Sequence, residues 1–247
     1  MKYKKYNFSW DNEESQKVFQ SLVGFPDMKD SCKEVNAILA CVKLKRGSKI
    51  LDVGCGIGRH AIIFAQKGFK VIAMDVSHYY LKQAKYSARM KQTKIEFRQQ
   101  NIFELQDVES YDFVFAYDYT LGSMSAKELK KQFRAMYLAL KPNCIFFLKY
   151  AGPKLALRQK NSIKVEIVKN NYVIEEQKFI DNFRFEKCLL IDPKKKEIKK
   201  WQEKQRIFNR AEINMLLHNA GFKICNQCMF QKYLKENIKN IFVCSKL

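Results

Sequence analysis

The sequence lacks the features that mark a membrane-spanning or exported protein. It contains no run of about 18 apolar residues, which a membrane-spanning helix needs. Residues 1–6 carry charge but are not followed by an apolar segment, so we expect no signal peptide. The 8 cysteines have no spacing typical of a disulfide framework. We therefore expect reduced thiols in a cytoplasmic protein that does not insert into a membrane.

Acidic side chains are scarce as well. The chain has 25 Asp and Glu residues against 46 Lys and Arg, which gives a net charge of +21. Such an excess favours a polyanionic partner such as nucleic acid. The basic residues are spread over most of the chain, however, which also fits a lysine-rich proteome without such a partner. Charge alone therefore does not identify a substrate.

The remaining composition is typical of a globular protein. Hydrophobic residues make up 47% and aromatic residues 13% of the chain, as in folded rather than disordered proteins. A length of 247 residues suffices for one α/β domain with an embellishment and a sizeable core.

A glycine turn at residues 54–58 is the feature around which the chain is organised. The apolar residues Ile50, Leu51 and Val53 before it predict a short buried strand of a parallel sheet. Gly54, Gly56 and Gly58 leave the turn without side chains, so a ligand can approach the backbone closely. The helix expected after the turn directs its free N–H groups toward the same place. We expect a nucleotide-like ligand there.

The spacing of the glycines distinguishes between nucleotide ligands. A dinucleotide site has the pattern G-x-G-x-x-G, but Arg59 stands where its third glycine would be. The pattern is instead G-x-G-x-G, with Asp52 two positions before the first glycine. This pattern resembles the nucleotide-binding motif of class I S-adenosylmethionine-dependent methyltransferases. The alternatives are a tight strand-to-helix turn without a ligand, and an NAD site.

Three later positions fit the same cofactor. Asp75 follows Gly54 by 75 − 54 = 21 positions, where an acidic residue accepts hydrogen bonds from ribose hydroxyls. The alternative for Asp75 is a helix cap for the segment that begins at Val76. Asn101 stands where the resembling family carries an acidic residue for the adenine amino group, and its carbonyl oxygen can still accept that bond. Ile102 would lie against the adenine ring.

The resemblance implies S-adenosylmethionine (SAM) as the cofactor and S-adenosylhomocysteine as its product. The implied cofactor contacts come from the glycine turn and from the ends of the second, third and fourth strands. They are Asp52, Gly54, Cys55, Gly56, Gly58, Arg59, Asp75, Val76, Asn101, Ile102 and Tyr117. No metal is expected, because Cys225 and Cys228 form a lone C-x-x-C pair without a second pair of ligands nearby.

The rest of the pattern predicts an α/β fold. Ser31 is expected to cap a helix, and strands at residues 69–75, 94–98, 111–117 and 144–150 alternate with further helices. A terminal pair of strands completes the Rossmann-like, doubly wound, seven-stranded mixed sheet that the resemblance implies.

An antiparallel β insertion interrupts this fold. Residues 163–208 alternate polar and apolar side chains, which predicts a hairpin and further strands. We therefore divide the chain into four parts: an N-terminal lid segment (1–30), a SAM-binding core (31–150), the β insertion as a substrate flap (151–208) and a C-terminal completion of the core (209–247).

The substrate side of the site is less well defined. The loop after the fourth strand lies at the carboxyl edge of the sheet, where ligands bind, although it also fits an ordinary surface loop. The aromatic residues near the N-terminus either stack on a ligand or pin that segment to the domain. A stretch at residues 206–212 resembles the family's R-x-aromatic-T-x-x-E signature, with Asn209 in place of Thr. The substrate-side candidates are Asp118, Tyr119, Tyr6, Trp10 and Arg206.

Methyl transfer makes few demands on protein side chains. The methyl group of a sulfonium is already activated, so the protein mainly aligns the attacking lone pair. A base is needed only if the nucleophile arrives protonated. No catalytic triad is visible, and His60, His78 and His218 each serve either as a base or in packing or solvation.

The expected function is methyl transfer to a nucleophilic N or O of a small molecule by in-line displacement. The β insertion and the stretch at 206–212 resemble small-molecule methyltransferases, including N-methyltransferases of amino sugars and amines. An RNA- or DNA-directed methyltransferase is the alternative, although residues 117–120 lack the N/D-P-P-Y tetrapeptide frequent in enzymes that methylate nucleic-acid amino groups. A non-catalytic cofactor-binding regulator is a third hypothesis.

Overall fold

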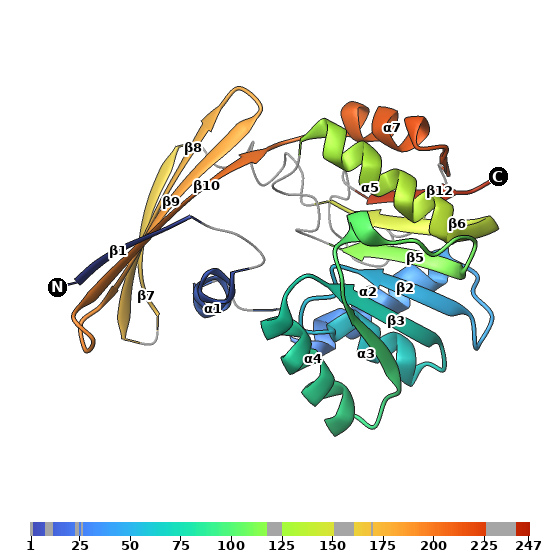
Figure 1. Ribbon diagram of the computed structural model, residues 1–247, viewed down its shortest axis with the longest axis horizontal. Helices are drawn as coiled ribbons and strands as arrows, with labels where there is room; N and C mark the ends of the chain where they lie inside the picture. The colour runs from blue at the N-terminus through green and yellow to red at the C-terminus, as the bar shows by residue number, and fades with distance from the viewer. Residues whose placement is uncertain are drawn as a thin grey trace. The chain divides into compact units, whose positions relative to one another are not determined.

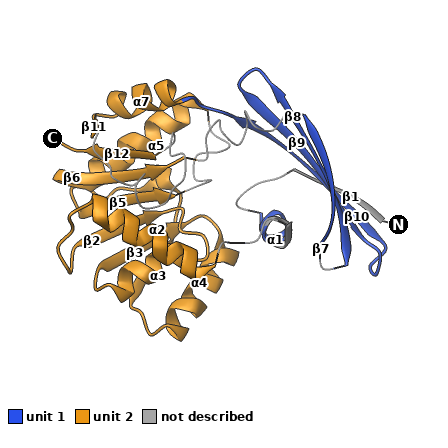
Figure 2. Ribbon diagram, turned by 180° about the vertical axis from the view of Figure 1, so that it is seen from behind, with its two compact units in different colours: residues 1–25, 122–124, 152–209 blue, residues 26–121, 125–151, 210–247 orange. Residues whose placement is uncertain are grey.

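The structure is a computed structural model of the 247-residue chain. It describes residues 2–7, 12–22, 25, 27–117, 125–150, 161–168, 170–225 and 241–247. The chain divides into two compact units (Figure 2). The small unit comprises residues 1–25, 122–124 and 152–209, and the large unit comprises residues 26–121, 125–151 and 210–247. Among the described helices, none has the length and apolar character that crossing a membrane requires.

The large unit is built on a seven-stranded mixed sheet with the strand order β11-β12-β6-β5-β2-β3-β4. Five parallel strands form its centre and one edge. They are β2 (Lys49–Val53), β3 (Lys70–Asp75), β4 (Ile95–Gln99), β5 (Tyr111–Tyr117) and β6 (Leu140–Lys149). The antiparallel strands β12 (Ile241–Ser245) and β11 (Lys223–Ile224) complete the other edge. The prediction of a Rossmann-like sheet of seven strands is confirmed.

Helices connect the parallel strands and cover both faces of this sheet (Figure 1). They are α2 (Met28–Cys41), α3 (Arg59–Gln66), α4 (His78–Met90), α5 (Ala126–Ala139) and α7 (Arg210–Asn219), with a 3₁₀ turn at Ile102–Glu104. From β2 to β4 the chain crosses the sheet in one direction, and from β5 to β6 it crosses in the opposite direction. Because the crossovers between parallel strands are right-handed, α3 and α4 lie on one face of the sheet and α5 lies on the other. Accordingly, α2 packs on α3, and α5 packs on α7.

The first helix of the large unit begins earlier than the sequence suggests. Its N-cap is Asp27, whose carboxylate accepts a hydrogen bond from the backbone N–H of Asp30 at 2.8 Å. Ser31 lies inside the helix, fully buried, and its hydroxyl donates to the carbonyl of Asp27 at 3.1 Å. The prediction that Ser31 caps the helix is therefore wrong. Asp27 is an equally good capping residue one turn upstream, and helix α2 begins there.

The core of the large unit is aromatic. Phe115 on the central strand β5 stacks on Phe147 of β6, with ring centroids 5.7 Å apart, and meets Phe64 of α3 edge-on at 5.4 Å. All three side chains are fully buried. A strand that is buried on both faces needs a nearly continuous apolar run, which residues 113–117 provide. This packing fixes the carboxyl end of β5 beside that of β2.

The small unit contains the antiparallel insertion that the sequence predicts, as a five-stranded sheet with the order β1-β10-β9-β8-β7. Four of its strands pair antiparallel in sequence order. They are β7 (Ser162–Val168), β8 (Asn171–Ile180), β9 (Phe183–Asp192) and β10 (Glu197–Arg206). Helix α1 (Glu13–Leu22) belongs to the same unit, and its Glu14 pairs with Lys199 of β10 at 2.9 Å.

The fifth strand of this sheet, β1 (Lys2–Asn7), pairs parallel to β10. The sequence did not indicate this strand, because its partner lies almost 200 residues away at Glu197–Arg206 and parallel pairing leaves no hairpin signal. The N-terminal segment, which we expected as a separate lid, thus contributes a strand to the sheet formed by the insertion. A lid function for residues 1–30 stays a prediction.

Candidate functional site

The glycine turn lies at the carboxyl end of β2, where the strand order reverses between β3 and β5. Such reversal points are the usual ligand-binding positions of open α/β sheets. The turn is held to the neighbouring strand by the N–H groups of Gly54 and Cys55, which donate to the carbonyl of Met74 at 2.8 and 3.0 Å. The local fold therefore presents the turn at the edge that the sequence predicts.

All three glycines of the turn have left-handed backbones. Their φ angles are 70° for Gly54, 54° for Gly56 and 76° for Gly58, values that other residues adopt only with strain. A Cβ at Gly58 would lie 3.0 Å from the Cβ of Ala84 in α4. Close packing of α3 on α4 therefore also requires glycine at position 58.

Asp75 ties the turn to the end of β3. One of its carboxylate oxygens accepts from the N–H of Gly56 at 2.7 Å, and the other accepts from the N–H of Ser77 at 2.9 Å. The cap of α4 is Ser77, whose hydroxyl accepts from the N–H of Tyr80. Asp75 is thus not the helix cap. Burial raises the pKa of Asp75, although the hydrogen bonds from Ser77, Gly56 and Val76 oppose that shift.

Asp52 is the most unusual group of the site. It is 2% exposed, and its carboxylate accepts a hydrogen bond from the backbone N–H of Ala61. The oxygen Oδ2 has no hydrogen-bond partner in the part of the chain that the structure describes. Burial raises the pKa of Asp52 to about 7, the nearby charge of Asp75 adds to that shift, and Arg59 opposes it. A positively charged ligand would lower this pKa again.

Asn101 and Arg59 reach this edge from different elements: Asn101 follows strand β4, and Arg59 is the first residue of helix α3. Gln100 donates from its N–H to the carbonyl of Asp75 at 3.1 Å, so Asn101 lies just beyond the end of β3. The side-chain oxygen of Asn101 caps the 3₁₀ turn by accepting from the N–H of Phe103 at 3.1 Å and, in a capping box, from the N–H of Glu104. The guanidinium of Arg59 donates to the hydroxyl of Ser31.

Tyr117, at the end of β5, belongs to a polar cluster that the sequence did not reveal. Its hydroxyl donates to Glu34 at 2.5 Å and accepts from the ammonium of Lys149 at 2.8 Å. The ring of His60 joins through a 2.8 Å hydrogen bond between its Nε2 and the other oxygen of Glu34. We call these four residues the Tyr117 cluster. They connect α2, the start of α3, and the ends of β5 and β6.

Charges in the Tyr117 cluster stabilise one another. Burial alone would raise the pKa of Glu34, but the hydrogen bonds from His60 and Tyr117 and the charge of Lys149 lower it overall. Burial lowers the pKa of His60, and its bond to Glu34 opposes this shift. At neutral pH the cluster therefore holds an ionised carboxylate beside a neutral imidazole.

The structure does not bring every sequence candidate to this site. Asp118, Tyr119, Trp10 and the side chain of Tyr6 lie outside the described part of the molecule. Arg206 belongs to the small unit, where its guanidinium faces the ring of Phe208 at 4.6 Å.

The remaining polar candidates are two histidines and two cysteines. His78 is exposed beside Gln99, and His218 is exposed at the end of α7. Cys225 is a free thiol, while Cys228 is not among the described residues. Within the described ranges no three His, Cys, Asp or Glu side chains are placed to hold a metal ion.

Sequence reasoning missed Glu34 and Lys149. Lys149 had a usable signal, because a charged residue at the end of an apolar run marks the carboxyl end of a buried strand, as Asp75 does. Glu34 had none, since a single charged residue on a helix is usually exposed to solvent.

Comparison with known proteins identifies the class. Residues 50–143 match the family described as methyltransferase domain. A protein of Geobacillus sp. (strain WCH70) that is named as a methyltransferase is 38% identical over 99 residues, which are 39% of this chain and 40% of the relative. A tRNA (uracil(54)-C(5))-methyltransferase of Pyrococcus furiosus is 25% identical over 158 residues, 62% of this chain and 34% of the relative. The chain thus spans less than half the length of these two relatives.

Solved structures match over nearly the whole chain. An S-adenosylmethionine-dependent methyltransferase from Clostridium acetobutylicum has a TM-score of 0.75 at 18% identity and covers 94% of this chain and 98% of its own. The sugar N-methyltransferase KedS8 from Streptoalloteichus sp. has a TM-score of 0.69 at 15% identity, with 98% and 95% covered. Residues 50–143 thus match a methyltransferase domain, and the chain has the fold of these SAM-dependent methyltransferases.

The cofactor of this class is SAM, and the residues at the sheet edge fit it. The buried Oδ2 of Asp52 needs a hydrogen-bond donor or a positive charge, and SAM carries an ammonium and a sulfonium. The open backbone at Gly54 and Gly56 and the carboxylate of Asp75 suit a nucleoside with free hydroxyls.

Proposed function

We propose that this protein is an enzyme that transfers a methyl group from SAM to a nucleophilic nitrogen or oxygen of a small molecule by in-line displacement. The observation that carries the proposal is the combination of the left-handed glycine turn, the Asp75 carboxylate bound to it, and the buried oxygen of Asp52 without a partner among the described residues. Together they place two carboxyl groups and an open backbone at the carboxyl edge of the sheet, within the residues that match a methyltransferase domain.

Each residue has a role in this proposal. Asp75 accepts hydrogen bonds from the ribose hydroxyls, and Asn101 and Ile102 contact the adenine. The turn at Gly54 and Gly56 lies along the methionine moiety. When bound, SAM supplies a methyl group on a positively charged sulfur, so the protein needs to position the acceptor rather than to activate the donor.

The proposal gives Asp52 a pH-dependent role. Without ligand its pKa is about 7, so it is partly protonated in neutral buffer, and a cationic ligand favours its ionised form. We expect SAM to bind more tightly as pH rises from 6 to 8 and to release protons on binding below about pH 7. Calorimetry in two buffers of different ionisation enthalpy measures this proton release. In Asp52→Asn the pH dependence should vanish; its persistence would assign the effect to another group.

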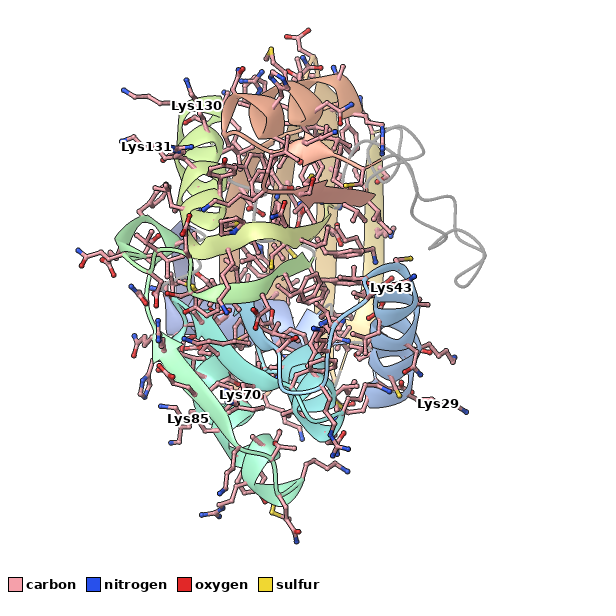
Figure 3. All side chains as sticks on the ribbon, turned by 90° about the vertical axis from the view of Figure 1, so that its right-hand side faces the viewer. Lys29, Lys43, Lys70, Lys85, Lys130 and Lys131 are labelled. Atoms are coloured by element: carbon pink, nitrogen blue, oxygen red, sulfur yellow. The ribbon has the colours of Figure 1, made fainter. Side chains whose placement is uncertain are left out.

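Two observations support a small-molecule acceptor. The likeness to a protein titled as a sugar N-methyltransferase extends over 95% of that protein, whereas the tRNA methyltransferase relative matches over only 34% of its own length. Exposed basic side chains of the large unit also come from several parts of the fold. Lys29, Lys43, Lys70, Lys85 and Lys130, labelled in Figure 3, are all exposed and lie on or next to α2, β3, α4 and α5.

The net charge of +21 favours the second candidate, a nucleic-acid acceptor. The two functions differ in their acceptors and in their response to salt. We expect labelled methyl groups from SAM to enter the low-molecular-weight fraction of a cell extract, with little change in rate between about 50 and 200 mM salt. A nucleic-acid substrate would instead take the label into RNA or DNA, with binding that falls steeply with salt.

A further inference from the structure

The small unit carries a second group of polar side chains that are buried or largely buried. Glu186 on β9 lies directly opposite Gln177 on β8 and Glu203 on β10, so these three side chains form a row across the sheet on one face. Glu175 and Arg184 lie on the same face, two residues away from Gln177 and Glu186 along their strands. We call these five residues the carboxylate cluster. All of them come from the insertion.

Pairing within the carboxylate cluster is incomplete. The guanidinium of Arg184 lies 3.2 Å from Glu186 and 3.9 Å from Glu203, so one positive charge faces two carboxylates. The exposed Lys164 on β7 lies opposite Glu175. Glu203 Oε1 and Arg184 Nε are buried without a hydrogen-bond partner among the described residues. Buried carboxylates that exceed their counter-charges are costly, so they require an explanation beyond folding.

Gln177 is a second, independent case of incomplete pairing in the carboxylate cluster. Its side chain is 7% exposed, and its amide nitrogen donates to the carboxylate of Glu175. The amide oxygen is also buried, and no described residue donates to it. Leaving a buried amide oxygen without a donor is energetically costly. This oxygen, in the middle of the cluster, is suited to accept a hydrogen bond from a ligand.

The electrostatics of the cluster favour a cation. Burial raises the pKa of Glu186 to about 7; Arg184 opposes the shift, and the charges of Glu175 and Glu203 add to it. Burial also raises the pKa of Glu203, with Arg184 again opposing. A concentration of negative charge is unusual in a chain with a net charge of +21, and a bound cation would relieve the mutual repulsion.

The arrangement does not suit a bare metal ion. No set of three His, Cys, Asp or Glu side chains converges on a metal position anywhere in the described chain. The unsatisfied groups include an amide oxygen and an Arg N–H as well as a carboxylate oxygen. A ligand that satisfies all three must offer donors and an acceptor spread over several atoms. An organic ammonium with neighbouring hydroxyl groups has this chemistry.

We propose that the carboxylate cluster is a binding site for a small organic molecule with a protonated amine beside hydroxyl groups. The ammonium donates to Glu203 and Glu186, and a hydroxyl donates to Gln177 while accepting from Arg184. Trp201, buried on the same face and two residues before Glu203, provides apolar surface. The proposal concerns the small unit alone and does not require methyl transfer.

A matched pair of probes tests this site. We expect 3-amino-1,2-propanediol, which stays protonated between pH 6 and 8, to bind in calorimetry and to change the fluorescence of Trp201 in a Trp10→Phe background. Glycerol, its neutral counterpart, should produce neither signal. Binding should strengthen as pH rises through about 7, because Glu186 then loses its proton. Glu203→Gln should weaken binding at least tenfold.

Glu176→Gln is the matched control. Glu176 lies on the same strand as Gln177 but on the opposite face of the sheet, where it pairs with Lys178 at 2.7 Å, so its replacement should leave amine binding unchanged. Three outcomes would each overturn the proposal. The protein could respond equally to glycerol and to the amine, or both Glu variants could lose amine binding equally. The third is saturable binding of MgCl₂ that displaces the amine. SAM binding measured on the same samples tests the proposed function separately.

Discussion

Replacing Asp75 with alanine is expected to weaken SAM binding by about 100-fold or more, since two charge-assisted hydrogen bonds of about 1.5–3 kcal/mol each are lost. The carboxylate has two tasks in the proposed complex. It would accept from the ribose hydroxyls, and it already holds the N–H of Gly56 at 2.7 Å and that of Ser77 at 2.9 Å. Removing it therefore loosens the glycine turn as well as deleting a ligand contact. Isothermal titration calorimetry with SAM measures the loss.

Asp112 offers a matched control for this experiment. Its carboxylate likewise binds a backbone N–H, that of Lys49 at 2.7 Å, and an ammonium, that of Lys141 at 2.7 Å. It lies near the start of β5, however, at the opposite edge of the parallel strands. Asp112→Ala should cost some stability and leave SAM affinity within about threefold. An Asp75→Ala protein that bound SAM as tightly as Asp112→Ala would refute the assignment of Asp75.

The sequence predicted those parts of the fold that depend on local patterns. The bounds 111–117 of the strand β5 are confirmed, because an apolar run between polar residues marks a central parallel strand. The glycine turn and Asp75 were found for a similar reason: each lies at a fixed distance from a strand end.

The parts that the sequence did not predict depend on contacts between distant residues. Strand β1 pairs with β10, at Glu197–Arg206, which lies almost 200 positions further along the chain. Glu34 reaches Tyr117 across 83 positions of sequence. The carboxylate cluster likewise results from the register of three strands. A one-residue shift of that register would turn these side chains to the other face. No local pattern encodes such a juxtaposition.

Replacing Glu34 with leucine is expected to lower the unfolding free energy of the large unit by about 2–4 kcal/mol, since it breaks a largely buried charged network. The Glu34 side chain is 16% exposed and accepts from both Tyr117 and His60. Its charge also faces the ammonium of Lys149. Leucine provides neither the acceptors nor the charge. Urea unfolding followed by circular dichroism, with separate midpoints for the two units, measures the loss.

The pH dependence of this loss identifies its cause. The folded state lowers the pKa of Glu34, so its contribution is present above the unfolded value and disappears as pH falls through the lower, folded value. The difference between wild type and Glu34→Leu should therefore shrink below pH 4.5, the ordinary value for glutamate. Glu96→Leu is the control: the Glu96 side chain, which pairs with Arg98, is 57% exposed. Its replacement should lower the unfolding free energy by no more than about 0.5 kcal/mol. A loss in Glu34→Leu that stayed constant down to pH 3 would point to packing rather than to charge.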